Sequence, residues 1–125
     1  MADDFLAMIE ELFASVGTVR LRRMFGGHGV YLDGNFVAIV WREQLYLKAD
    51  ESTAAEFEAA GLERFRPTAK ADYSLGFYTA PVEALEDPEQ FRLWAIKAKA
   101  AAVRSARGKS ARIPSRSAAK GGRRP

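Results

Sequence analysis

The stretch RLRRMFGGHG, residues 20–29, brings together three arginines, three glycines and the only histidine of the chain. A glycine-rich loop can cradle phosphate, but the dinucleotide-binding and Walker patterns both require the loop to open a helix. Here Gly26, Gly27 and Gly29 lead into another predicted strand. The glycines are therefore better explained by a positive φ or a close backbone approach where one strand bends into the next.

The histidine and the arginines each have a simpler explanation than catalysis. His28 could act as a general base, but that role needs an orienting partner and a nucleophile or substrate nearby, and the sequence indicates neither. The side chains of Arg20, Arg22 and Arg23 could together line a binding site for an anion. A solvated strand face, paired with surplus carboxylates, is the more common arrangement. We therefore expect no catalytic residue, although a small ligand-binding or enzymatic domain using residues 23–28 stays an alternative.

Composition narrows the other kinds of site. The chain has no cysteine, which excludes disulfides, thiolate catalysis and cysteine-ligated metals. With one histidine, only carboxylates could hold a metal, so we expect neither metal nor cofactor. Acidic residues interrupt the apolar N-terminus, unlike a signal peptide, and no later stretch approaches the ~18 apolar residues of a membrane span. These features predict a cytoplasmic protein without membrane contact.

Charge is distributed unevenly along the chain. Residues 104–125 carry eight basic side chains and no acidic one, whereas residues 1–103 hold the other 11 basic and all 16 acidic residues, a balance of −5. Such a basic segment can neutralise phosphates without reading bases, which predicts weak, nonspecific, salt-dependent contact with nucleic acid. A solubilising extension, or one that folds back on the acidic body, is the alternative. The candidate contacts are Arg104, Arg107, Lys109, Arg112, Arg116, Lys120, Arg123 and Arg124.

The hydrophobic periods predict a single small α+β domain over residues 1–103. Apolar residues repeat on one face of a helix over 4–16, and Gly17 is expected to cap it in the left-handed conformation. Alternation of period two then predicts strands over 18–25, 29–41 and 44–50. The middle stretch folds into a hairpin at Asp33-Gly34 and meets the next strand at a turn at Arg42-Glu43. These strands form an antiparallel meander.

In the second half of the chain, the sequence predicts one helix before the last strands of the sheet and one helix after them. The T-x-x-E pattern at Thr53 and Glu56 is typical of a capping box, and Gly61 ends that middle helix. Residues 62–80 indicate a strand, a polar loop and a strand, giving about five strands in all. Asp87-Pro88 begins a C-terminal helix. Beyond Arg107 the chain is too poor in large apolar residues to offset the entropy of ordering, which predicts a disordered basic tail.

The ordered set of motifs resembles the TfoX (Sxy) N-terminal domain family. The residues that carry the resemblance are Arg23-Met24-Phe25-Gly26-Gly27 before a Gly-Val-Tyr strand, Leu45-Tyr46-Leu47-Lys48-Ala49-Asp50, Gly76-Phe77-Tyr78 and Glu86-Asp87-Pro88. The resemblance covers roughly residues 5–103. It implies a small α+β fold and an association with transcriptional regulation, without catalytic residues. The best-known members regulate natural competence together with the cyclic-AMP receptor protein, and a second, helical domain follows where this chain has its basic segment.

Together these features predict a non-enzymatic regulatory or adaptor protein. Its body would contact a protein partner, such as the transcription machinery or a regulator, and residues 104–125 would contact nucleic acid. A pure protein-interaction module is the alternative, and an exposed apolar patch on the sheet including Trp41 or Tyr46 would favour it. The motif Arg23, Met24, Phe25, Gly26 and Gly27 is expected to serve the architecture of the fold.

Overall fold

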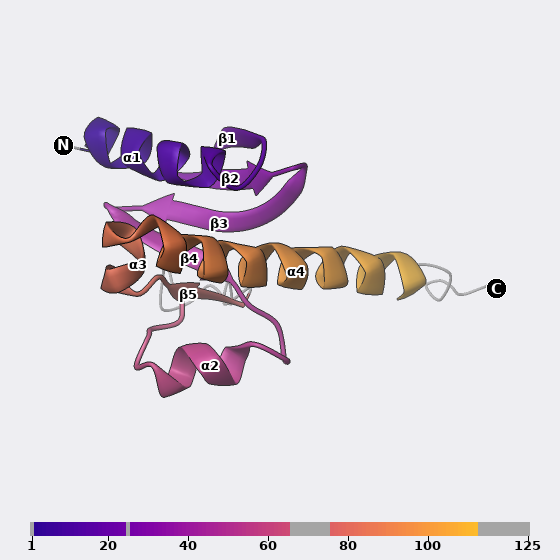
Figure 1. The fold of residues 1–125 in the computed structure, drawn as a ribbon. Coiled ribbons are helices and arrows are strands. Elements are labelled where there is room, and N and C mark those ends of the chain that lie inside the picture. Colours follow the sequence, from indigo (N-terminus) through magenta and orange to yellow (C-terminus); the bar gives the residue numbers. More distant parts are fainter. Residues whose placement is uncertain (1, 25, 66–75, 113–125) are drawn as a thin grey trace.

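The computed structural model describes residues 2–24, 26–65 and 76–112, which form one five-stranded antiparallel sheet and its helices (Figure 1). The strands follow one another across the sheet in chain order, from β1 to β5. This is the predicted α+β meander. The helices are α1 (Ala2–Ala14), α2 (Ala54–Ala59), α3 (Val82–Glu86) and α4 (Pro88–Arg112); the strands are β1 (Val19–Met24), β2 (Gly27–Leu32), β3 (Asn35–Trp41), β4 (Gln44–Lys48) and β5 (Phe77–Thr79).

The main core lies between α1, α4 and one face of the sheet. Phe13 of α1 meets Phe91 of α4 edge to face, with ring centroids 4.8 Å apart. Alternate strand residues such as Val30 and Leu47 fill the space beneath, with no exposed surface. Burial of these side chains is the main stabilising contribution to the fold, because each removes a large apolar area from water.

The opposite face of the sheet carries a second, smaller cluster. Ile39, Phe65 and Phe77 are buried there, with Trp41 and Tyr46 packed against them. Phe77 and its neighbour Tyr78 therefore point to opposite faces, as strand alternation predicts. The sheet is apolar on both sides, and its second face is strongly aromatic.

Turns with positive φ join the strands where the sequence predicts them. Asp33 and Gly34 have φ values of 51° and 85°, and Arg42 and Glu43 have 52° and 58°. Two successive residues with positive φ are typical of type I′ turns, whose twist matches that of a hairpin. The predictions of both turns are thus confirmed.

Local predictions at two helix ends are wrong in their mechanism. Gly17 has no positive φ; a Cβ there would lie 2.6 Å from a carboxylate oxygen of Asp33, so close approach requires the glycine. Thr53 precedes α2 but makes no capping hydrogen bond to it. Its Oγ1 instead accepts a hydrogen bond from the backbone nitrogen of Asp50, over 3.0 Å. The helix begins where the sequence predicts, but Thr53 stabilises the turn over residues 50–53 that precedes the helix rather than the helix itself.

The segment after α2 pairs with the sheet more briefly than predicted. Phe65 donates its backbone N–H to Phe77, and Thr79 donates to Glu63, over 2.7 and 2.8 Å. These bonds make a single bridge at Arg64 rather than a full strand. The rest of the predicted strand and its loop, residues 66–75, lie outside the described residues. The short helix α3 was not predicted.

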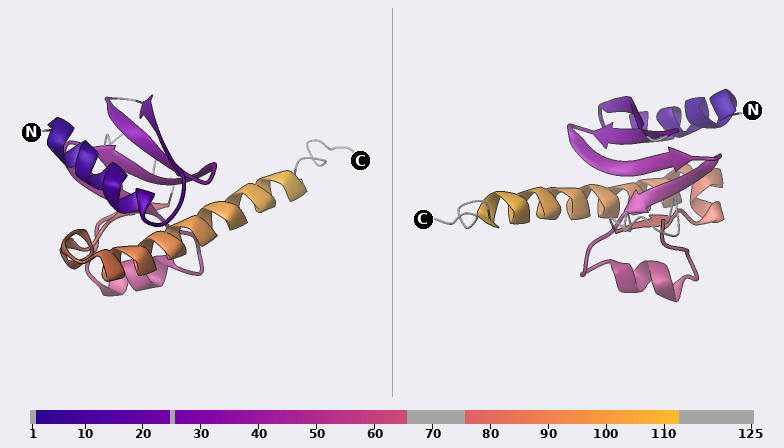
Figure 2. Two further views of the ribbon diagram at one scale, coloured as in Figure 1. Left: turned by 45° about the horizontal axis from the view of Figure 1, so that its top comes forward. Right: turned by 180° about the vertical axis from the view of Figure 1, so that it is seen from behind.

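The C-terminal helix is longer than the sequence predicts. Asp87 Oδ1 accepts the backbone N–H of Glu89 over 3.0 Å, which confirms the predicted start. The helix continues past Arg107 and ends at Arg112, because the alanine, lysine and arginine residues in this stretch favour helix strongly enough to carry it past Gly108. Its last turns extend beyond the sheet (Figures 1 and 2). Residues 113–125 of the predicted tail lie outside the described residues.

Candidate functional site

The described motif residues lie at the end of β1, at the start of β2 and in the turn between them. β1 is an edge strand of the sheet, and β2 pairs with it. Met24 pairs with Gly27 across this hairpin, and Gly26 has a φ of +80°. A Cβ on Gly27 would collide with the carbonyl oxygen of Val40 on β3. Phe25 lies outside the described residues. The glycines thus lead from strand to strand, and no helix begins here to hold a phosphate group.

A cleft of about 460 Å³ opens beside this turn. His28 and Arg42 line it, together with an apolar wall that includes Phe5 and Leu6 of α1. The Arg42 guanidinium is held over the Trp41 ring, 4.4 Å from its centroid. In the described part of the chain, His28 has no hydrogen bond or ion pair with another side chain, and no group of His, Asp and Glu there could hold a metal ion. The cleft can bind a small group, but these residues offer no nucleophile beside a base.

Three ion pairs tie α4 to the body. Lys97 pairs with Glu56 over 2.9 Å, and Lys99 pairs with Asp33 over 2.8 Å. Arg104 makes two hydrogen bonds to the carboxylate of Asp50, over 2.5 and 3.2 Å. These bonds hold the pKa of the Asp50 carboxyl well below its usual range. Arg104, a predicted nucleic-acid contact, is therefore engaged with the body.

The other predicted contacts follow this anchor along the chain. Arg107 is exposed on α4. Lys109 and Arg112 belong to the last turns of the same helix. Arg116, Lys120, Arg123 and Arg124 lie outside the described residues. Arg104 thus marks a boundary on α4, because Lys97, Lys99 and Arg104 pair with the body and the helix continues beyond them. We call residues 105–112 the arm.

The arginines of β1 are exposed, as expected, but they have no acidic partner within the described chain. Arg20, Arg22 and Arg23 lie on the edge strand of the sheet. The body's carboxylates at Asp33, Asp50 and Glu56 pair with α4 instead. The exposed strand face thus agrees with the expectation, but the described carboxylates do not pair with these arginines. Exposed cations on an edge strand also discourage pairing with a second sheet.

Beside these arginines lies a row of aromatic side chains that the sequence analysis missed. Arg20 is directly opposite Tyr31, and Tyr31 is directly opposite Phe36. The Tyr31 and Phe36 rings stack, with centroids 5.0 Å apart and planes at 17°. Phe36 then contacts Phe77, with centroids 5.1 Å apart. We call Arg20, Tyr31 and Phe36 the sheet row.

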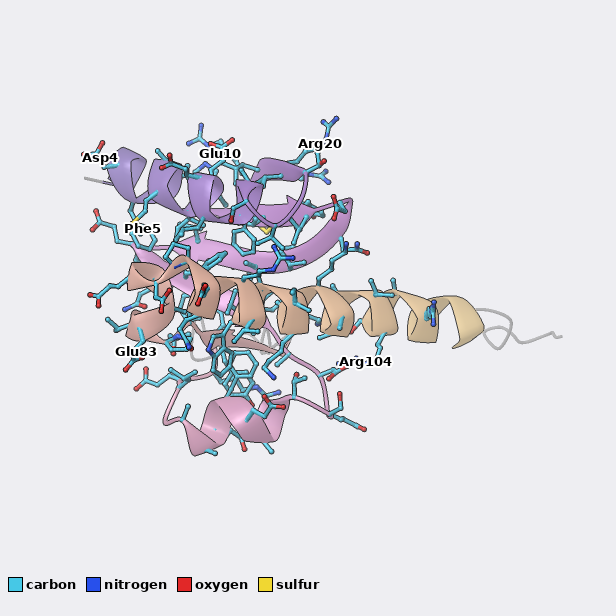
Figure 3. All side chains as sticks on the ribbon, in the orientation of Figure 1. Asp4, Phe5, Glu10, Arg20, Glu83 and Arg104 are labelled. Atoms are coloured by element: carbon cyan, nitrogen blue, oxygen red, sulfur yellow. The ribbon has the colours of Figure 1, made fainter. Side chains whose placement is uncertain are left out.

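A groove of about 260 Å³ separates the sheet row from the arm. Tyr31 and Phe36 line one side, and Ala102, Ser105 and Ala106 of α4 line the other. The labelled Arg20 lies at the end of the molecule from which α4 extends (Figure 3). The signal for this site is the strand register, because it places Arg20, Tyr31 and Phe36, which come from three different strands, side by side.

The apolar side chains that are most exposed lie on helices rather than on the sheet. Trp41 and Tyr46, expected in an exposed patch, are only partly exposed because both rings pack edge-on against Phe65. By contrast, Leu93 and Ile96 on α4 are 56% and 46% exposed. They are three residues apart, so they share one face of the helix.

Comparison with known proteins matches residues 11–102 to the model of the TfoX N-terminal domain family. A search of curated proteins finds no match to the chain. Among the residues that the structure describes, no helix is both long and apolar enough to cross a membrane.

Proposed function

The chain belongs to the TfoX N-terminal domain family, and we propose that it is a non-enzymatic regulatory or adaptor protein, linked to transcription, that contacts nucleic acid through its C-terminal arm. The observation that carries this proposal is the position of the Arg104–Asp50 ion pair. This pair is the last one between α4 and the body in the described chain, and the helix continues past it to Arg112.

The backbone of the arm continues beyond the last ion pair between α4 and the body in the described chain. At 1.5 Å per residue, the helix advances about 12 Å between Arg104 and Arg112. The body's carboxylates that face α4 are already paired with Lys97, Lys99 and Arg104. The cations beyond Arg104 are therefore better placed for an external polyanion than for folding back. A duplex presents such a polyanion, and contacts to its phosphates need no sequence preference.

Salt dependence tests this proposal. A fluorescein-labelled 20-base-pair duplex is titrated with the full chain, and binding is followed by fluorescence anisotropy between 50 and 200 mM salt. With about six phosphate contacts, from the arm together with the basic residues that follow it in the sequence, the affinity should fall roughly a thousandfold over this range. Absence of binding at 50 mM salt would refute the proposal.

A matched pair of substitutions places the contact on the arm. Arg107→Ala should reduce the slope of log affinity against log salt by about 1, since one phosphate contact is lost. Arg92→Ala removes the same charge from an exposed position of α4 that lies about 22 Å away along the helix, and it should leave the slope unchanged. Equal effects of the two substitutions would mean that net charge, rather than the arm, governs binding.

The body offers a separate surface for a protein partner. Leu93 and Ile96 are exposed on one face of α4, and Val82 on the neighbouring α3 is 66% exposed. Exposed apolar side chains on adjacent helices are typical of protein contacts. Replacing Leu93 and Ile96 with serine should abolish capture of a partner by the immobilised chain, while duplex binding persists. Unchanged capture would place the partner elsewhere on the body.

A further inference from the structure

We propose that the groove between the sheet row and the arm binds single-stranded nucleic acid by stacking a base on Tyr31. This inference rests on the proposed function and specifies the class of nucleic acid that the protein prefers. It assigns a role to the sheet row and its arginines, which the arm alone does not use.

The stacked ring pair provides a surface suited to a base. Tyr31 and Phe36 are nearly parallel, and both are partly exposed. Phe36 is supported from behind by the buried Phe77. A base has a flat π face whatever its identity, so stacking on an exposed, supported aromatic ring gives affinity without sequence preference.

The cations beside the rings are placed for the strand's backbone. Arg20 is directly opposite Tyr31, and Arg22 is directly opposite Gly29, which has no side chain to cover it. Directly opposite residues in an antiparallel pair project from the same face of the sheet. A phosphate next to a stacked base would thus lie near Arg20 at the sheet edge or near Lys48, which lines the groove itself.

The groove has room for one ring system rather than for a larger ligand. Its volume of about 260 Å³ is below the approximately 300–1,000 Å³ of pockets that enclose drug-sized molecules. Ser105, Asn35 and Lys48 line it beside the aromatic and alanine side chains and can offer hydrogen bonds to a base edge or a phosphate. A paired duplex does not expose the face of an internal base, so this contact favours a single strand.

An acidic protein segment would satisfy the arginines but leave the ring faces unused. Carboxylates pair with cations such as Arg20 and the groove-lining Lys48, but they gain nothing from the partly exposed rings of Tyr31 and Phe36. A nucleotide uses both features at once, because its phosphate is anionic and its base is planar and aromatic. Complementarity of both kinds therefore favours a nucleic-acid strand over a peptide.

Anisotropy titrations with labelled 12-nucleotide oligothymidine and a 12-base-pair duplex, both with the full chain, test the proposal. The single strand should bind more tightly than the duplex. Tyr31→Leu should weaken binding of oligothymidine by roughly 5- to 150-fold, the range for losing one base–aromatic stack. Tyr31→Phe keeps the ring and should bind within about twofold of the unaltered chain. Trp41→Leu, which removes a partly exposed aromatic at the far end of β3, should also have little effect.

Three combinations of results separate the groove from the arm and from an acidic protein ligand. Equal binding of single strand and duplex, with no loss in Tyr31→Leu but a loss in Arg107→Ala, would leave the arm's function standing and refute the groove. Loss in Tyr31→Leu without loss in Arg107→Ala would support the groove and refute the arm. Displacement of the strand by polyglutamate that is independent of Tyr31 would indicate an acidic protein ligand.

A further measurement uses the unaltered chain, so it does not depend on whether a variant folds. Addition of oligothymidine should shift the backbone amide resonances of Tyr31, Phe36 and Ser105 in a two-dimensional NMR spectrum. Shifts confined to the arm, with these three resonances unmoved, would refute binding in the groove.

Discussion

Alanine substitutions at Gly26, Gly27 and Gly29 should have three different effects on stability. The structure gives each glycine a distinct reason to lack a side chain. At Gly27 the added Cβ would meet the carbonyl oxygen of Val40 and lie 2.9 Å from Cδ1 of Trp41. The carbonyl belongs to the backbone of β3, which cannot move away without disturbing its pairing with β2. Gly27→Ala should therefore be the most destabilising of the three.

The expected magnitudes follow from what each Cβ meets. Overpacking of this kind costs roughly 1–3 kcal/mol, so we expect about 2–3 kcal/mol at Gly27. Gly26 has open space around its Cβ, and Gly26→Ala should cost only about 1 kcal/mol for its positive φ. At Gly29 the nearest atom is the terminal methyl of Met24, at 2.6 Å, which a flexible side chain can move. The gain in strand propensity partly offsets this shift, so Gly29→Ala should cost less than about 1 kcal/mol.

Urea unfolding followed by circular dichroism measures these differences. For a domain of this size the m-value is about 1–3 kcal/mol per molar urea, so Gly27→Ala should lower the midpoint by about 1 M or more. Equal m-values across the series are needed for the comparison. A midpoint for Gly27→Ala at or above that of Gly26→Ala would refute the steric reasoning, and with it an architectural role for the second glycine of the motif.

Two further predictions concern hydrogen bonds to carboxylates. Arg104 lowers the folded-state pKa of Asp50 below its unfolded value near 3.8. The pair therefore stabilises the fold above about pH 4, and that stability is lost as the pH falls further. Urea midpoints measured from pH 5 to pH 2 should decline less steeply in Asp50→Asn than in the unaltered chain, and an equal slope would contradict this. The hydroxyl of buried Tyr78 donates a hydrogen bond to Glu58 over 2.7 Å, so Tyr78→Phe should cost about 1 kcal/mol in urea unfolding, whereas a gain in stability would show that the bond does not offset the cost of burying the hydroxyl.

Local signals in the sequence were sufficient to predict most of the elements. Asp33-Gly34 between apolar runs predicts a type I′ hairpin because few residues tolerate positive φ twice in succession, and the hairpin forms there. Asp87-Pro88 predicts the start of α4 because an aspartate can accept a free N–H and a proline lacks one, and the helix begins at Pro88. In both cases the physical cause lies within four consecutive residues.

Features that depend on distant residues could not be predicted in the same way. The prediction of a left-handed cap at Gly17 is wrong, since its φ is not positive. What disfavours a side chain there is the carboxylate of Asp33, which lies in another turn and would be 2.6 Å from a Cβ. The sheet row depends on the register of three strands and on an irregularity between Val30 and Tyr31 that brings Tyr31 opposite Phe36. A shift of one residue would place these rings on the opposite face of the sheet.

Asp33 also explains how the two walls of the groove keep their positions. One of its carboxylate oxygens accepts the backbone N–H of Thr18 over 2.9 Å, and the other pairs with Lys99 over 2.8 Å. A single turn residue therefore joins the start of β1, the β2–β3 hairpin and α4, and the Arg104–Asp50 pair holds α4 again at the beginning of the arm.

Each of these surface ion pairs adds little to global stability, because both partners are accessible to water. Their position has a second effect, because they hold the groove wall that carries Tyr31 and the wall that carries Ser105 in place before a nucleic-acid strand binds. A binding site whose walls are already ordered loses less conformational entropy when it is occupied. The ion pairs that hold α4 to the body would therefore also favour binding at the proposed groove.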